Sequence, residues 1–128
     1  MSFNWADYLT VADKVAGMVE GDHELAEGYY RTAISRAYYA AFNIAKQALP
    51  ERLSKRCPKG AGAHKYVKRQ YENGEAPDQR AVGDDLHRLR IARNKADYYP
   101  EWGDAGKQCA AGLGMARRTI ECVKSHPL

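Results

Sequence analysis

The sequence has little of what a disulfide-bonded, metal-binding or membrane-spanning protein needs. Its three cysteines, Cys57, Cys109 and Cys122, are an odd number at wide spacings, which fits neither a disulfide framework nor a zinc site. We therefore expect free thiols and no bound metal or other cofactor. The longest apolar runs, such as AYYAAF, are far too short to cross a bilayer. The N-terminal residues also lack the basic and apolar segments of a signal or transit peptide. These absences predict a cytoplasmic protein that makes no membrane contact.

Sustained alternation of apolar and polar residues is also absent, so no β-strands are expected. The 128 residues suffice for one domain, 1–128, with its own core. Glycines and prolines divide the chain into five segments with helical periodicity. The expected helices cover residues 4–21, 24–49, 63–72, 78–97 and 104–125, with a loop at 50–62. The sequence thus predicts an all-α protein, an up-and-down bundle of four long helices plus one short helix.

The charge balance is mildly basic. Twenty Lys and Arg residues against sixteen Asp and Glu residues give a formal net charge of +4 and a pI near 9.0. This excess is compatible with RNA, DNA or a nucleotide as partner, but most proteins with such a balance are merely soluble.

An arginine interrupts the apolar stripe of the fourth expected helix. The stripe contains Val82, Leu86, Leu89 and Ala96 at steps of three or four residues, and Arg93 occupies the remaining position. Since a buried guanidinium without a partner is costly to desolvate, Arg93 needs a counter-charge from the protein or from a ligand.

Two partners suit Arg93, and they do not exclude each other. Asp97 lies four residues further on and can form an ion pair with Arg93 along the helix. Alternatively, the five N–H donors of the guanidinium, with Asn94 beside them, suit a phosphate group. A carboxylate that orients the arginine would also preorganise it for such a ligand.

The stretch SRAYYAAF, residues 35–42, is a second candidate. Ser35, Arg36 and Tyr39 could present polar atoms along one side of their helix while the alanines pack against a neighbour. An ordinary amphipathic surface is the competing interpretation.

Three stretches together resemble the HEPN superfamily, the small helical proteins of prokaryotic toxin–antitoxin and defence systems. They are RTAISRAYYAAFNIAK at 31–46, a helix that opens with His64 followed by Val67, and LHRLRIARNKADY at 86–98. The resemblance implies a bundle that usually forms a homodimer, in which two Arg-Asn motifs share a cleft. Many members are metal-independent endoribonucleases, with a motif of an arginine, four to six residues, and a histidine. Other members bind nucleotides or accompany a minimal nucleotidyltransferase, which adds AMP to a tyrosine near the motif.

Transferred to this chain, the resemblance assigns the motif arginine and asparagine to Arg93 and Asn94. Tyr98 stands where the motif histidine is expected. An unperturbed phenol, with a pKa near 10, accepts protons less readily at pH 7 than an imidazole with a pKa near 6.5. His87 should face another direction, about 120° from Arg93 around the helix, whereas His64, on another helix, could reach a dimer cleft. Tyr98 and Tyr99 are the candidates for AMP addition.

Three functions therefore remain open from the sequence. The first is binding of RNA or nucleotide phosphate at a dimer cleft, with or without a nucleotidyltransferase antitoxin as partner. The second is metal-independent endoribonuclease activity, with Arg93, Asn94 and Tyr98 as catalytic residues. The third is a purely structural dimer network. The residues expected to bind RNA or a nucleotide are Arg93, Asn94, Asp97, Arg36, Tyr39 and His64.

Overall fold

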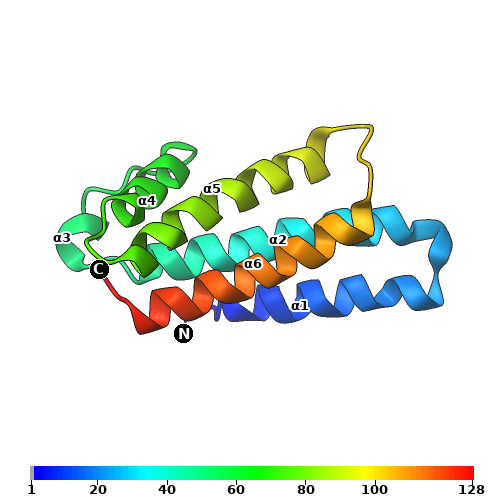
Figure 1. The fold of residues 1–128 in the computed structure, drawn as a ribbon, viewed down its shortest axis with the longest axis horizontal. Helices are drawn as coiled ribbons and strands as arrows, with labels where there is room; N and C mark the ends of the chain where they lie inside the picture. Colours follow the sequence, from blue (N-terminus) through cyan, green and yellow to red (C-terminus); the bar gives the residue numbers. More distant parts are fainter. Residues whose placement is uncertain (1) are drawn as a thin grey trace.

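The protein is an all-helical bundle, and the computed structural model describes residues 2–128 of it. Four long helices alternate in direction along the chain and lie side by side (Figure 1). A shorter helix packs beside the first half of α5, and a single helical turn precedes it. The α-helices are α1 (Ala6–Gly17), α2 (Ala26–Gln47), α3 (Glu51–Ser54), α4 (Gly62–Glu72), α5 (Pro77–Tyr98) and α6 (Ala105–Ser125). The all-α bundle predicted from the sequence is confirmed.

The structure refines the expected boundaries at two places. The first helix keeps α-helical geometry only to Gly17, and two 3-10 turns, Met18–Gly21 and His23–Leu25, lead into α2. The expected loop at 50–62 contains α3, which begins directly after Pro50. A proline is tolerated there because a helix start leaves its N–H groups unpaired in any case. This favourable start explains why the proline-rich stretch still forms one turn of helix.

The core lies around α2, whose alanines allow its neighbours to approach closely. Ala33, Ala37, Ala41 and Ala45 are fully buried, and α2 packs against α1, α5 and α6. An apolar stripe of α6 is also buried: Cys109, Leu113, Ala116, Ile120 and Val123. The three cysteines are free thiols. None of the helices formed by residues 2–128 combines the length and apolarity needed to cross a membrane.

Two buried polar groups fix how the helices meet. Tyr71 of α4 is fully buried, and its hydroxyl donates to the carbonyl oxygen of Ala45 on α2 at 2.8 Å. Burial raises the pKa of Tyr71 to about 12. Asp85 of α5 is also buried and accepts hydrogen bonds from the Arg118 guanidinium of α6 at 2.9 and 3.1 Å. Each contact pins one pair of helices in register.

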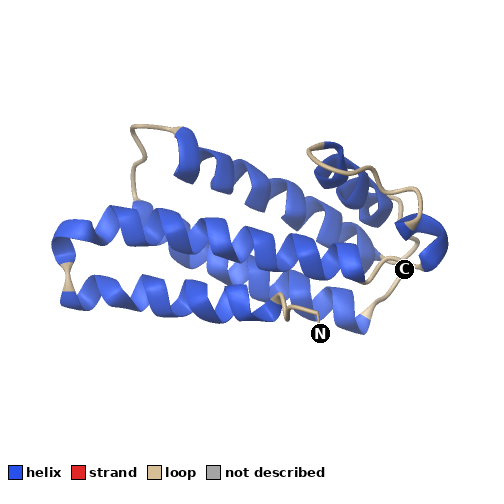
Figure 2. Cartoon of the chain, turned by 180° about the vertical axis from the view of Figure 1, so that it is seen from behind, coloured by secondary structure: helices blue, strands red, loops and turns tan. Residues whose placement is uncertain are grey.

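The second half of α5 diverges from α4 and faces α2. Viewed from behind, its C-terminal end and the following loop lie toward the same end of the bundle as the connection between α1 and α2 (Figure 2). Val82, Leu86, Leu89 and Ala96 are buried, as the sequence stripe predicts. The remaining position of that stripe, Arg93, therefore lies between α5 and the rest of the bundle.

Candidate functional site

Arg93 and Asp97 form an ion pair along α5. Arg93 Nε lies 2.9 Å from Asp97 Oδ2, and the two side chains are 17% and 27% exposed. The N–H of the buried Nε is not aligned with an acceptor as a hydrogen bond requires, so the attraction is mainly electrostatic. Arg93 Nη1 donates to Asn94 Oδ1 at 2.9 Å. Arg93 is thus mostly buried and has the counter-charge that the sequence suggested.

Residues of α2 form the wall that faces this ion pair. The Ser35 hydroxyl donates to Asp97 Oδ2 at 3.4 Å, which links the two helices. The guanidinium carbons of Arg36 and Arg93 lie 5.2 Å and 5.1 Å from the centroid of the Tyr39 ring. Tyr39 therefore contacts two cations, and each contact falls in the range of cation–π attraction.

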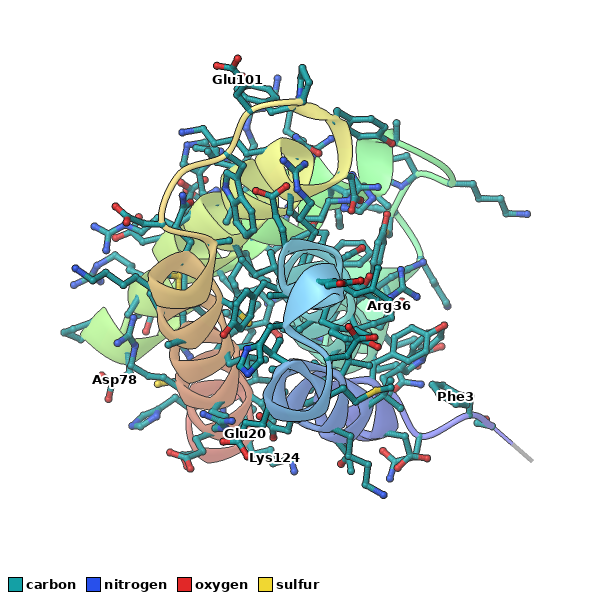
Figure 3. The ribbon with its side chains drawn as sticks, turned by 90° about the vertical axis from the view of Figure 1, so that its right-hand side faces the viewer. Phe3, Glu20, Arg36, Asp78, Glu101 and Lys124 are labelled. Carbon is teal, nitrogen blue, oxygen red and sulfur yellow. The ribbon has the colours of Figure 1, made fainter. Side chains whose placement is uncertain are left out.

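The start of the chain supplies aromatic side chains to the same side of the molecule. The Arg36 guanidinium carbon lies 4.8 Å from the centroid of the Tyr8 ring. Tyr8 also packs against Trp5, with ring centroids 5.4 Å apart, and Phe3 contacts both rings. Viewed along the bundle, Phe3 and Arg36 lie on one side and Asp78 on the other (Figure 3). The aromatic cluster thus borders the arginines.

These walls enclose a hollow of about 400 Å³, which we call the Arg93 cleft. It is lined by Trp5, Tyr8, Ser35, Arg36, Tyr39, Asn43, Arg93 and Asp97. A larger hollow of about 540 Å³ lies near the start of α5, around Gly74 and Gln79, but contains none of the expected site residues. Two guanidiniums and several aromatic faces give the Arg93 cleft the groups that suit a phosphate and a flat ring.

His64 of α4 lies next to this cleft but does not line it. Its ring stacks on Phe42, with centroids 4.2 Å apart, and its Nδ1 shares a hydrogen bond with the Tyr38 hydroxyl. The centroids of the His64 and Tyr39 rings are 6.3 Å apart. Burial lowers the pKa of His64, and the charges of Arg90, Arg93 and Lys46 lower it further. Both effects favour the neutral form of His64.

The comparison with protein families assigns most of this chain. The HEPN domain model matches residues 19–126, which contain five of the six α-helices and most of the Arg93 cleft. The chain belongs to the HEPN family. It matches no curated protein and no solved structure. The HEPN resemblance drawn from the sequence is therefore confirmed.

Only some of the site residues expected from the sequence line the Arg93 cleft. Arg93, Asp97, Arg36 and Tyr39 line one cleft. Asn94 contacts Arg93 from outside the lining, and the Tyr98 ring centroid lies 5.6 Å from the Arg93 guanidinium carbon. Tyr98 is 70% exposed, and Tyr99 is exposed as well. His64 lies beyond Tyr39. Within residues 2–128, no three His, Cys, Asp or Glu side chains are placed to hold a metal ion.

A contact that the sequence did not predict fixes the C-terminal end of α5. Arg31 of α2 donates from Nη1 to the carbonyl oxygens of Ala96 at 2.9 Å and Tyr99 at 2.6 Å. Its guanidinium also lies 5.3 Å from the Trp102 ring centroid. The last carbonyls of a helix have no partner within the helix, so Arg31 caps α5. Helical spacing shows only that Arg31 precedes Ser35 by one turn of α2, and it does not reveal the acceptors at the end of α5.

Other residues of the cleft were also missed. Trp5, Tyr8 and Asn43 line it, and none of the three was predicted as a site residue. Periodicity within one helix cannot show which other helix its polar edge will face. Helical spacing could have linked Asn43 to Tyr39, because Asn43 Nδ2 donates to the Tyr39 carbonyl oxygen one turn earlier at 2.9 Å.

Proposed function

We propose that this HEPN protein binds RNA or a nucleotide through a phosphate at the Arg93 cleft, as a component of a toxin–antitoxin or defence system. One observation carries the proposal: two guanidiniums, from Arg36 and Arg93, flank one aromatic ring in a hollow of about 400 Å³. A guanidinium binds phosphate oxygens through two parallel N–H donors. Tyr39 and Tyr8 supply faces on which a base can stack.

Asp97 has a positioning role in this proposal. It holds Arg93 Nε while the other nitrogens of the guanidinium keep donors for a ligand. The carboxylate itself is held by Ser35 from α2. A preorganised arginine loses less side-chain freedom when it binds a ligand, which favours affinity.

The binding proposal is tested with an arginine inside the cleft and one outside it. Fluorescence polarisation of a labelled single-stranded RNA and calorimetry with AMP give both affinities. Loss of a charge-assisted contact costs about 1.5–3 kcal/mol, so Arg93→Ala should weaken binding by about ten- to hundredfold. Arg88→Ala is the matched control, because Arg88 is exposed on the same helix and lies outside the cleft. Equal affinities for the two variants would contradict the proposal.

Metal-independent endoribonuclease activity is the second candidate function, and the neutral His64 next to the arginines favours it. In that reaction a base takes the proton of a ribose 2′-hydroxyl, whose oxygen attacks the neighbouring phosphorus. The bond from phosphorus to the 5′-oxygen breaks and that oxygen gains a proton, which leaves a 2′,3′-cyclic phosphate and a 5′-hydroxyl. Arg93 would stabilise the charge on the phosphate, Asn94 would hold Arg93, and His64 or Tyr98 would handle the protons.

Incubation of single-stranded RNA in EDTA tests this second function. Cleavage that is lost in Arg93→Ala, and in either His64→Gln or Tyr98→Phe, supports a nuclease and identifies the residue that carries the proton. If the RNA is bound but stays intact, the result supports the binding function and contradicts the nuclease function. Mass spectrometry of the fragments should find cyclic phosphate ends if the stated chemistry applies.

We further propose that two copies form a homodimer whose Arg93 clefts open into a shared groove, and that a nucleotidyltransferase can act on Tyr98 or Tyr99. The exposure of both tyrosines supports access by an enzyme. Analytical ultracentrifugation tests the dimer. Intact mass after co-expression with a neighbouring nucleotidyltransferase gene tests the modification, because each AMP adds a defined mass. A Tyr98→Phe, Tyr99→Phe double variant should stay unmodified.

A further inference from the structure

Another hollow, of about 170 Å³, lies between α4 and α5. We call it the α4–α5 pocket. Its lining contains no acidic side chain and five basic ones: His64, Lys65, Lys68, His87 and Arg90, with Tyr38 and Leu86 completing the wall. Pockets for drug-sized ligands begin near 300 Å³, and one water molecule occupies about 30 Å³. The α4–α5 pocket therefore has the size of a small anion and the charge to attract one.

Arg90 is the least satisfied of these groups. Its Nε is buried and has no hydrogen-bond partner in the part of the chain that the structure describes. No carboxylate among residues 2–128 forms an ion pair with Arg90 or Lys65. Lys68 has only a loose partner, Glu72, at 3.8 Å. Buried donors are normally paired, so Arg90 lacks an acceptor that an anion would supply.

The α4–α5 pocket and the Arg93 cleft are neighbours. Arg90 and Arg93 are three residues apart on α5, so their side chains project from the same side of the helix. The His64 ring centroid lies 6.3 Å from the Tyr39 ring centroid, which lies 5.1 Å from the Arg93 guanidinium carbon. Tyr39, which lines the Arg93 cleft, thus lies between Arg93 and His64, which lines the α4–α5 pocket. The two hollows are therefore close enough for one nucleic acid strand to contact both.

From this arrangement we infer that the α4–α5 pocket binds a second phosphate of the same ligand, with Arg90, Lys65 and His64 as its contacts. The inference rests on the proposed function of the Arg93 cleft and narrows its ligand. A nucleoside monophosphate such as AMP carries one phosphate and cannot fill both sites, whereas single-stranded RNA can. The preferred ligand is therefore an RNA strand, and its backbone passes over Tyr39.

Binding of two probes separates the second site from the first. The probes are AMP and a fluorescein-labelled RNA of eight adenosines. Loss of one charge-assisted contact predicts that Arg90→Ala weakens binding of the octamer about tenfold and leaves AMP binding within about twofold. The slope of log affinity against log salt for the octamer should also decrease by about one. Arg88→Ala, two residues away and outside both hollows, should change neither affinity.

A second variant, on the rim of the pocket, keeps the test possible if Arg90→Ala does not fold. If circular dichroism shows that Arg90→Ala does not fold, Lys65→Ala at an exposed position provides the same comparison. Unchanged octamer affinity in the folded variant, or equal losses for AMP and octamer, overturns the inference.

A third measurement examines the pocket without RNA. Inorganic phosphate is titrated into the Arg93→Ala protein, which lacks the cleft arginine, while the imidazole signals of His64 are followed by NMR. The signals should shift with saturation, and the shift should disappear when Arg90→Ala is added. No shift up to saturating phosphate overturns the pocket as a phosphate site.

The proposed function can fail independently of this inference. A wild-type protein that binds neither AMP nor the octamer contradicts the function of the Arg93 cleft, whatever phosphate does at His64. A protein that loses AMP binding in Arg93→Ala but keeps octamer affinity in the Arg90 variant retains the first site and lacks the second.

Discussion

Arg31 shows how much a single side chain contributes to this fold. Its side chain is only 18% exposed, and its guanidinium ties α2 to the last turn of α5, which carries Asp97 and Tyr98. Without it, the carbonyl oxygens of Ala96 and Tyr99 would have no donor from α2. The geometry of the cleft therefore depends on a residue that does not line it.

Arg31→Ala should lower the free energy of unfolding by about 2–3 kcal/mol, because it removes charge-assisted hydrogen bonds from a mostly buried group. Urea denaturation measures this loss. Hydrogen exchange should also become faster at the amides of residues 96–99. Arg88→Ala, which removes an exposed arginine, should stay close to wild type; a similar loss in both variants would argue against this role of Arg31.

Single residues also show where sequence reasoning ends. Arg93 could be placed because it interrupts a stripe of its own helix, and Asp97 because it lies one turn away. Arg31 and Arg90 could not be recognised in this way, since the acceptors of Arg31 lie 65–69 positions away along the chain and the pocket around Arg90 needs α4. The spacing of residues along the sequence predicts contacts within one helix. Contacts between helices depend on how the helices pack against one another.

At the scale of the elements, α4 and α5 lie unusually close where they cross. A Cβ atom added at Gly83 would lie 2.6 Å from Glu72 Cγ and 2.8 Å from the Glu72 backbone nitrogen. The backbone of α4 cannot yield without moving the helix, which also carries His64. Gly83 therefore fixes how near α4 lies to α5, and with it the width of the α4–α5 pocket.

Two glycine substitutions distinguish the effect of this close contact on stability from the effect of helix propensity. Gly83→Ala should destabilise the protein by about 1–3 kcal/mol, because overpacking outweighs the gain of about 1 kcal/mol from a better helix former. Gly114→Ala, in α6 where a Cβ meets nothing within 4 Å, should instead stabilise it by about 0.5–1 kcal/mol. Thermal unfolding monitored by circular dichroism distinguishes the two, and stabilisation by Gly83→Ala would show that α4 moves freely.

The long helices could be predicted because their periodicity and their stops agree. Pro50, Asn73-Gly74 and Pro100 end segments whose apolar stripes match the buried residues of α2, α4 and α5. The turn α3 could not, because four residues are too few to show a period. Trp5 and Tyr8, at the start of the chain, are only half-buried and border the cleft, which the period of their own helix does not predict.

At the scale of the whole molecule, buried titratable groups define a pH range of stability. The pKa of His64 is lowered, first by burial and then by nearby cations, so below pH 6.5 the unfolded chain takes up a proton that the folded protein resists. Burial raises the pKa of the Cys109 thiol from 9.0 to about 11 and that of Tyr71 from 10.0 to about 12. Above pH 9 the unfolded chain therefore loses protons first, and stability decreases again.

The loss of stability at acid pH can be assigned to one group, His64. Urea unfolding between pH 5 and 7.5 should show stability that falls as the pH drops below 6.5 and continues to fall towards the folded-state pKa of His64. The charged and titratable groups around His64 are Tyr38, Tyr39, Lys46, Lys65, Lys68, His87, Arg90 and Arg93. In His64→Phe, which keeps the stacking on Phe42, the fall should be smaller. An unchanged pH profile would assign it to another group.

The cations around His64 also make the two hollows thermodynamically dependent on each other. Arg93 is one of the charges that lower the pKa of His64, although it belongs to the other hollow. An anion that neutralises Arg93 removes part of that effect, so His64 becomes easier to protonate. Because such coupling is reciprocal, a proton on His64 strengthens anion binding at Arg93 by the same factor. Acidification would therefore raise the affinity of the protein for a phosphate and at the same time lower its free energy of unfolding.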